Sequence, residues 1–196
     1  TSSKIDSHVA HTLIVYSTTD GQTLRICQCL QEVVQQGGHQ VTLVDIVQAG
    51  ACDLQRYDTI VIGASIHYGK HAPIVLDFVK RHCTLLGNKP SAFFSVNVVA
   101  RKPNKNTPAT NPYLQKFLRQ IAWRPDHLAV FAGKINYPIY SPLDRLAIRL
   151  IMWMTNGPTA PDAVVEFTDW DQVRVFGRVL ATGLQVDGKP ADRPVA

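Results

Sequence analysis

The sequence predicts a three-layer α/β fold in which helices cover both faces of a five-stranded parallel sheet. Short apolar runs rich in β-branched residues alternate with amphipathic helical segments along most of the 196 residues. Such runs are typical of strands buried on both faces, and their alternation with helices indicates a parallel sheet. A single domain of this length can bury a core without disulfides or a structural metal.

Apolar runs that end at turn residues predict the five strands at residues 12–16, 41–44, 59–63, 91–96 and 127–132. Apolar residues at helical spacing predict helices at residues 24–34, 73–86, 111–121 and 170–180. Gly37 and Gly38 end the first helix, as glycine commonly does. We therefore expect one domain over residues 12–183, a flexible N-terminal extension at 1–11 and a flexible tail at 184–196.

An insertion near the fifth strand breaks the alternation. Residues 133–163 lie where a connection between a strand and a helix normally needs about 2 to 6 residues. Residues 137–142 are rich in aromatic residues and proline, residues 143–155 have a helical pattern, and residues 164–167 could resume the fifth strand. Loops of this length are usually functional or disordered. The apolar content of residues 143–155 argues against a solvated loop.

The composition limits the partners and the compartment. The net charge of +5 and the pI near 9.1 favour an anionic partner, which could be a phosphate, a carboxylate or an acidic lipid surface. We expect no nucleic-acid partner. The polar start shows no secretory signal, and no apolar run approaches the ~20 residues that span a bilayer.

The four cysteines are predicted to be packing residues. They are Cys27, Cys29, Cys52 and Cys83, and they have neither the spacing of a zinc or redox motif nor the density of a disulfide scaffold. Cys27 and Cys29 point to different faces of the first helix, so they are unsuited to share a metal ion. We expect a reducing compartment and no metal site.

The loop between the first strand and the first helix predicts an anion site. It consists of Ser17, Thr18, Thr19, Asp20, Gly21, Gln22 and Thr23. Hydroxyl groups, free backbone N–H groups and the positive end of a helix dipole together bind phosphate without a lysine. The chain has no GxxxxGK[ST] loop and no GxGxxG turn, which disfavours a nucleoside triphosphate or a Rossmann dinucleotide. Thr18, Asp20 and Thr23 would equally serve as turn and capping residues.

Residues 18–23, Thr-Thr-Asp-Gly-Gln-Thr, resemble the phosphate loop of the flavodoxin family, whose usual form is Ser/Thr, any residue, then Thr-Gly-Asn-Thr. The resemblance implies a flavodoxin-like fold that binds the phosphate of FMN. Asp20 stands where the family usually has threonine. Because a carboxylate repels phosphate, we expect Asp20 to point outward or to cap the helix.

Two further loops resemble those that hold the flavin in this family. The segment from Gly63 to His71 has the position and length of the loop beside the isoalloxazine ring, and small residues there let the backbone approach. The third loop, 95–103, lacks the aromatic residue that many flavodoxins place over the ring, which implies one open ring face for a large flat reactant. The candidate flavin ligands here are Ala64, Ser65, Ile66, His67, Tyr68, Gly69, Ser95, Val96 and Asn97.

Motifs spread over residues 12–180 narrow the resemblance. They are Ser-Thr-x-Asp-Gly-Gln-Thr at 17–23, Ile-Gly-Ala-Ser-Ile-His-Tyr-Gly at 62–69, Ser-Val-Asn-Val-Val-Ala-Arg-Lys-Pro at 95–103, Thr-Asn-Pro-Tyr at 110–113, Tyr-Pro-x-Tyr at 137–140 and Asp-Arg-x-x-Ile-x-Leu-Ile-Met at 144–152. Together they resemble the flavodoxin-like, quinone-dependent protoporphyrinogen IX dehydrogenases. The resemblance implies FMN-dependent oxidation of protoporphyrinogen IX in haem synthesis, with electrons passed to a membrane quinone.

Two other functions are weighed against this one. A flavodoxin-type electron carrier would have no substrate of its own, but such carriers are usually acidic, whereas this chain is basic and has an apolar insertion. An NAD(P)H:quinone oxidoreductase of related fold would require nicotinamide. No catalytic side chain is demanded by the dehydrogenase reaction, because the hydride goes to the flavin.

Basic side chains are candidates to bind the two propionates of the porphyrinogen. Arg101 and Lys102 follow the fourth strand, and Arg145 and Arg149 lie in the insertion. A solvated basic surface is the alternative for each of them. His67 and Tyr68 could stack on the flavin or shuttle protons, whereas His71 is expected to be an exposed residue before a helix.

The insertion helix is a candidate for membrane contact. A helix over residues 143–154 would be about 18 Å long, too short to cross a bilayer but able to lie in its interface with arginine and tryptophan at the headgroups. We expect peripheral attachment to the inner face of a cytoplasmic membrane or its organellar equivalent. The alternatives are packing on the protein's own core or on a second subunit of a homo-oligomer.

Overall fold

The computed structural model describes residues 9–183; residues 1–8 of the expected extension and the expected tail at 184–196 lie outside the described residues. Ala10 and His11 belong to the fold, although the sequence assigns them to the extension. Ala10 is buried and its N–H donates to His39 Nδ1 at 3.3 Å. Strand β1 (His11–Ser17) begins at the next residue.

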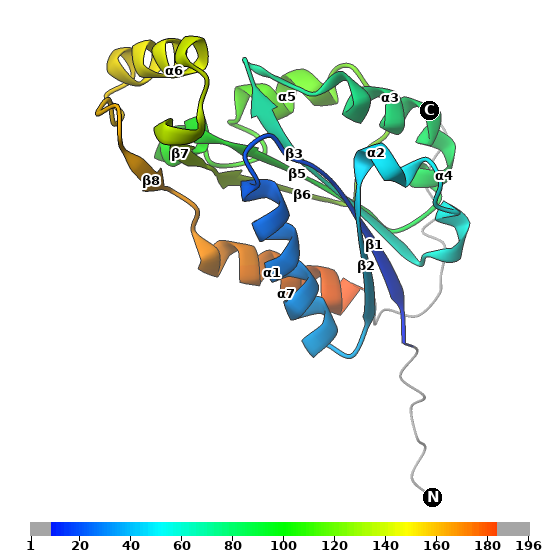
Figure 1. The fold of residues 1–196 in the computed structure, drawn as a ribbon. Coiled ribbons are helices and arrows are strands. Elements are labelled where there is room, and N and C mark those ends of the chain that lie inside the picture. The colour runs from blue at the N-terminus through cyan, green and yellow to red at the C-terminus, as the bar shows by residue number, and fades with distance from the viewer. Residues whose placement is uncertain (1–8, 184–196) are drawn as a thin grey trace, which may run out of the picture.

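The main sheet has the predicted five parallel strands (Figure 1). They are β1, β2 (Gln40–Asp45), β3 (Thr59–His67), β5 (Ser91–Asn97) and β6 (His127–Ala132), in the order β2-β1-β3-β5-β6. The short strand β4 (Lys70–His71) pairs antiparallel with the end of β3. This order is the doubly wound order found in flavodoxin, and it reverses between β1 and β3.

Helices cover both faces of this sheet (Figure 1). On one face lie α1 (Gln22–Gln36) and α7 (Trp170–Gly183); on the other lie α3 (Pro73–Arg81), α4 (Cys83–Gly87) and α5 (Pro112–Leu118), with the short α2 (Ile46–Ala49) beside them. The helix predicted over residues 73–86 is interrupted at His82, where φ is −105° and ψ is 15°. The described cysteines are all free thiols.

Each face of the sheet supports its own apolar core. Leu13 and Val15 pack on the side of α3 to α5, and Ile14 packs on the side of α1 and α7, as alternation along a strand requires. At Gly63 a Cβ atom would lie 2.1 Å from the ring of Phe94, so only glycine lets that ring cross the backbone of β3. Packing on both faces therefore holds the ends of the strands in place at the edge of the sheet.

The insertion folds as a small unit of its own. Strand β7 (Lys134–Asn136) pairs antiparallel with β8 (Val164–Glu166), so the expectation that residues 164–167 resume the fifth strand is wrong. Between them lie a 3₁₀ turn (Tyr137–Ile139) and the helix α6 (Pro142–Met154). Ile135, Tyr137 and Met152 form the buried core of this unit.

Helix α6 confirms the helical pattern that the sequence shows from residue 143 onward. Ser141 caps it, because the Ser141 Oγ accepts a hydrogen bond from the Asp144 N–H at 3.2 Å. Within residues 9–183, no helix has both the length and the apolarity needed to traverse a membrane. Figure 1 shows α6 beyond the ends of β3, β5 and β6, over the edge of the sheet where α1 begins.

Candidate functional site

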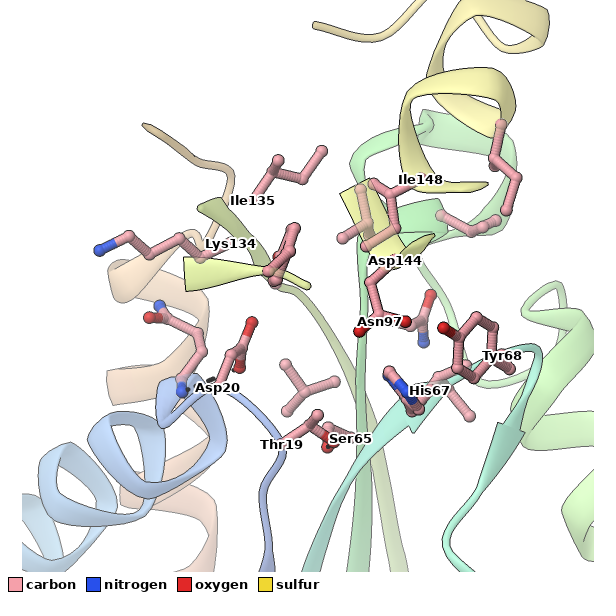
Figure 2. A pocket seen from close by; sticks show the side chains of 18 of the residues that line it. Thr19, Asp20, Ser65, His67, Tyr68, Asn97, Lys134, Ile135, Asp144 and Ile148 are labelled. Atoms are coloured by element: carbon pink, nitrogen blue, oxygen red, sulfur yellow. Dashed lines mark hydrogen bonds between the residues drawn. The ribbon is translucent and has the colours of Figure 1, made fainter. Parts of the chain in front are cut away.

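A cavity of about 300 Å³ lies at the carboxyl ends of β1, β3 and β5. Its walls come from the loop before α1, the hairpin of β3 and β4, the chain after β5 and the insertion (Figure 2). Parallel sheets bind ligands at this edge, next to the point where the strand order reverses. The predicted site residues that line it are Thr19, Asp20, Gln22, Ser65, Ile66, His67, Tyr68, Gly69, Val96 and Asn97. Those that do not are Ser17, Thr18, Gly21, Thr23, Ala64, Ser95, Arg101, Lys102, Arg145 and Arg149.

The loop before α1 is held by its own side chains. Gly21 has a φ of +87°, a left-handed conformation that suits glycine, and its N–H donates to Thr18 Oγ1 at 3.0 Å. Asp20 Oδ1 accepts from the Gln22 N–H at 3.3 Å. Asp20 therefore bonds the first N–H of α1, although Gly21 is the N-cap residue and Asp20 also lines the cavity. Its contact with a cofactor, like that of the rest of the loop, stays a prediction.

The buried hydroxyl of Thr23 is the feature of this loop that fits a bound anion. Its side chain is fully buried in the first turn of α1, and no hydrogen-bond partner for its Oγ1 exists among the described residues. A buried hydroxyl without a partner is unfavourable. A phosphate oxygen at this helix N-terminus would accept its hydrogen bond and would also meet N–H groups that have no partner within the helix. The residues present therefore fit a phosphate group.

The side chain of Gln22 anchors the insertion to α1. Its Nε2 donates to Glu166 Oε1 at 3.1 Å and to Thr168 Oγ1 at 2.9 Å. Arg25 pairs with Glu166 Oε2 at 3.0 Å. Burial alone would raise the pKa of Glu166, but hydrogen bonds from Arg25, Gln22 and Trp170 lower it below its ordinary value. The start of α1 and strand β8 are thus held together beside the cavity.

The second predicted loop is mostly a strand. Ala64 to His67 continue β3, and the turn is confined to Tyr68 and Gly69, whose φ angles are +49° and +74°. Antiparallel pairing with β4 supplies the backbone bonds that extend β3. The exposed rings of His67 and Tyr68 meet edge to face, with their centroids 4.1 Å apart, at the mouth of the cavity (Figure 2).

The hydroxyl of Ser65 links this hairpin to the loop before α1. Ser65 Oγ lies 3.3 Å from Thr19 Oγ1, and both side chains line the cavity. The carboxyl end of β3 and the phosphate loop are therefore adjacent, as the parallel sheet requires. Ala64 is buried and contributes to the core rather than to the cavity wall.

A buried polar network supports the end of β5. His71 Nε2 lies 3.0 Å from Ser95 Oγ, which accepts from Asn97 Nδ2 at 3.2 Å. Asn97 Oδ1 in turn accepts from Asn111 Nδ2 at 3.1 Å and from the Ala100 N–H at 3.0 Å. Ser95 to Asn97 therefore belong to strand β5, and Asn97 reaches the cavity from this network.

His71 is not the exposed residue that the sequence suggests. It is only 7% exposed, and its ring packs edge-on against Phe93 and Phe117. The pairing of β4 with β3 turns it inward, where α5 covers it. Burial lowers its pKa from 6.5 to about 4, so it is neutral near pH 7.

Comparison with known proteins assigns the family. A model described as a flavodoxin domain matches residues 13–162. The protoporphyrinogen IX dehydrogenase (quinone) of Escherichia coli K12 is 46% identical over 170 residues, which are 87% of this chain and 94% of that protein. That of Leishmania major is 41% identical over 170 residues, 86% of this chain and 74% of that protein. The chain belongs to the flavodoxin family and, within it, to the protoporphyrinogen IX dehydrogenases (quinone).

Solved structures agree on the fold. A flavodoxin from the domain Archaea superposes with a TM-score of 0.50 at 12% identity, covering 89% of this chain and 98% of that one. Flavodoxin 1 of Bacillus cereus superposes with a TM-score of 0.50 at 14% identity, covering 88% and 98%. Likenesses at such low identity show the flavodoxin-like fold alone. A flavodoxin domain implies flavin binding.

The arginines predicted to bind substrate donate hydrogen bonds to backbone carbonyls of the insertion. Arg101 donates to the Thr155 backbone oxygen at 3.0 Å and to its Oγ1 at 2.8 Å. Arg145 donates through Nε to the Tyr137 carbonyl at 3.2 Å, and Arg149 to the Thr159 carbonyl at 2.8 Å. Their donors meet backbone carbonyls because the insertion has many irregular turns whose carbonyls need partners. Lys102 does not line the cavity either. Substrate contact by these four residues stays a prediction without geometric support.

We expect Arg101→Ala to lower the free energy of unfolding by about 1 to 2 kcal/mol, because the Thr155 carbonyl loses a charged donor on a partly buried surface. Chemical denaturation measures this loss. Lys102→Ala is the matched control, since it removes the adjacent positive charge without removing a hydrogen bond that anchors α6. Equal stability of the two variants would contradict the anchoring role of Arg101.

The sequence missed cavity residues that come from the insertion and from α5. Those that matter most are Tyr113, Lys134, Tyr140, Asp144, Ile148 and Met152. Tyr113 and Tyr140 lie in motifs that carry the family resemblance. Their place in these motifs is the sequence signal that could have identified them as cavity residues. Lys134 lines the cavity, and Figure 2 shows its side chain extending outward from β7. The insertion therefore forms one wall of the cavity.

Proposed function

We propose that the protein binds FMN and oxidises protoporphyrinogen IX to protoporphyrin IX, with the electrons and protons passed in pairs to successive molecules of a membrane quinone, each of which is reduced to quinol. The observation that carries this proposal is the 46% identity to a dehydrogenase of that name over 94% of its length. The phosphate loop and the adjoining cavity support the FMN part of the proposal independently, because the residues present fit a phosphate group at a helix N-terminus.

The residues that would hold FMN come from three segments. Thr23, Thr19 and the first-turn N–H groups of α1 would bind the phosphate, and the hairpin of β3 and β4 with the end of β5 would enclose the ring. When bound, the flavin supplies the redox chemistry that links an organic donor to a quinone. Apolar side chains of the insertion, such as Ile135 and Ile148, would exclude water from the cavity.

The test follows porphyrin fluorescence when the purified, FMN-loaded protein meets protoporphyrinogen IX under anaerobic conditions. We expect porphyrin to form faster than in a protein-free control and only when a quinone is present. No acceleration would contradict the dehydrogenase function. Flavin reduction by a partner protein without porphyrinogen turnover would favour an electron carrier, and a requirement for nicotinamide would favour an NAD(P)H:quinone oxidoreductase.

We expect Thr23→Ala to weaken FMN binding by about 1 kcal/mol, roughly fivefold, because the buried hydroxyl loses a hydrogen bond to the phosphate. Titration of the apoprotein with FMN, followed by quenching of flavin fluorescence, measures the change. Thr23→Ser, which keeps the hydroxyl, is the matched control. If both variants bind FMN like the wild type, Thr23 has no contact with the phosphate.

The exposed face of α6 supports a peripheral membrane location. Leu143, Leu146, Leu150, Trp153 and Met154 are each more than half exposed. Arg145 and Arg149 lie on the same helix, and the chain carries a net charge of +5. An apolar helix face flanked by cations is suited to the interface of an anionic membrane. The opposite face of α6 lines the cavity, so a lipid-soluble quinone would reach the flavin site directly from the bilayer.

A further inference from the structure

A second hollow of about 220 Å³ lies beside the flavin cavity. Residues of β4 and α5 form most of its wall, namely Lys70, His71, Tyr113, Lys116 and Phe117, and Gln120 follows α5. Gly69 and Tyr113 line both hollows. Gly69 and Tyr113 therefore mark the shared boundary of the two hollows, where a Cβ on Gly69 would lie 3.8 Å from the Tyr113 ring.

The charge of this second hollow is positive. Lys70 and Lys116 are exposed and stand on different elements, yet both line it. No aspartate or glutamate is among its lining residues. Over residues 9–183 the ion pairs are Arg25–Glu166 and Arg174–Asp171, so neither lysine has a carboxylate partner. His71 is neutral at pH 7 and adds no charge there.

We propose that this second hollow is the subsite for the carboxylates of the substrate, with Lys70 and Lys116 binding its propionates. The inference rests on the proposed function, because protoporphyrinogen IX combines a large apolar macrocycle with two propionate side chains. With the flavin in the cavity, the macrocycle would stack at the cavity mouth, and its side chains would extend past Gly69 and Tyr113 into the second hollow. Two separate ammonium groups suit two carboxylates.

Other cations near the cavity are worse placed for this role. Arg101, Arg145 and Arg149 donate to backbone carbonyls of the insertion. Lys134 lines the flavin cavity from β7, and its side chain extends away from the hairpin of β3 and β4 (Figure 2). Lys70 and Lys116 are thus the pair that shares one hollow and has no competing acidic group.

The test measures binding to the FMN-loaded protein without turnover. Protoporphyrin IX, which keeps both propionates, and its dimethyl ester, which has no carboxylate, are titrated by fluorescence into the wild type, Lys70→Ala, Lys116→Ala and the double variant. We expect the Kd of protoporphyrin IX to rise about two- to fivefold for each single variant and about tenfold for the double variant, as exposed ion pairs allow. The Kd of the ester should stay unchanged, and arginine at either position should restore binding.

Two controls and a salt titration distinguish binding at this subsite from a general effect of positive charge. Arg119→Ala removes a positive charge from the turn after Lys116 without altering the second hollow, and it should bind protoporphyrin IX like the wild type. In turnover, the double variant should raise the KM for protoporphyrinogen IX with little change in kcat and with FMN content unchanged. Added salt should weaken binding of the diacid but not of the ester.

Three results would overturn the proposal. The first is unchanged binding of protoporphyrin IX by the double variant, and the second is an equal loss of diacid and ester binding. The third is a rise in Kd for Lys134→Ala but not for the two lysine variants, which would move the carboxylate site to β7. In these cases porphyrinogen oxidation by the wild type still upholds the proposed function. A wild type that neither binds protoporphyrin IX nor oxidises its porphyrinogen would overturn both.

Discussion

Replacing Leu146, Leu150 and Trp153 together with serine should weaken binding to vesicles that contain anionic lipid by roughly a hundredfold. These side chains are 66%, 55% and 72% exposed, so the protein itself gains little from them. Full burial of one large apolar side chain contributes about 1.5 to 3 kcal/mol, and partial burial of three in a lipid interface contributes about 3 kcal/mol or more. An exposed ion pair contributes under about 1 kcal/mol, so salt alone should release the wild type poorly.

Vesicle co-sedimentation measures this effect, with FMN content as the check on folding. The double variant Val175→Ser, Val179→Ser on the exposed face of α7 is the matched control, because its side chains are 51% and 41% exposed on a different helix. Vesicle binding that survives the triple substitution would rule out α6 as the membrane contact. If the wild type is instead a dimer that the triple variant dissociates, the face is a subunit interface.

Substitution on the surface of α6 is a sharper test than deletion of residues 141–156. The buried Met152 packs with Ile135 and Tyr137, and Arg101 is bonded to Thr155. Removing the helix would therefore expose this small core and leave the Arg101 guanidinium without its Thr155 acceptors. A loss of FMN in the deletion variant would report only that disruption.

Acidification should destabilise the protein through His71 by about 3 kcal/mol between pH 7 and pH 4. Burial lowers the pKa of His71 to about 4, whereas in the unfolded chain it returns to 6.5. The unfolded state therefore binds a proton that the folded state excludes over this interval. Stability is complete above pH 6.5, falls as the pH drops towards 4 and then levels off for this group. A difference of about 2.5 pH units corresponds to about 3 kcal/mol.

Urea denaturation at a series of pH values tests this expectation. His71→Gln should show a smaller loss of stability between pH 7 and pH 4 than the wild type, because the variant has no ring to protonate. His82→Gln is the control: burial lowers the pKa of His82 too, but this side chain is only partly buried. Identical pH profiles for the wild type and His71→Gln would show that the acid sensitivity lies elsewhere.

The layered fold and the family can be predicted from the sequence alone, and the sequence also predicts the phosphate loop. Strands such as β1 and β5 are apolar runs buried on both faces, and that signal is local. The left-handed Gly21 and the buried Thr23 lie within one seven-residue loop. An anion site there can therefore be predicted from local sequence, without knowledge of any distant contact. The motifs spread over residues 12–180 then indicated the family by their resemblance to it.

Contacts between distant segments determine which residues face the cavity and which support it. Strand β8 pairs with β7 rather than extending β6, and Arg101 bonds Thr155, 54 positions away, rather than a ligand. His71 looks like a loop residue in sequence, yet β3 pairing and α5 bury it. Partners such as these are chosen by hydrogen-bond satisfaction and burial between segments far apart in the chain, and no local pattern records that choice.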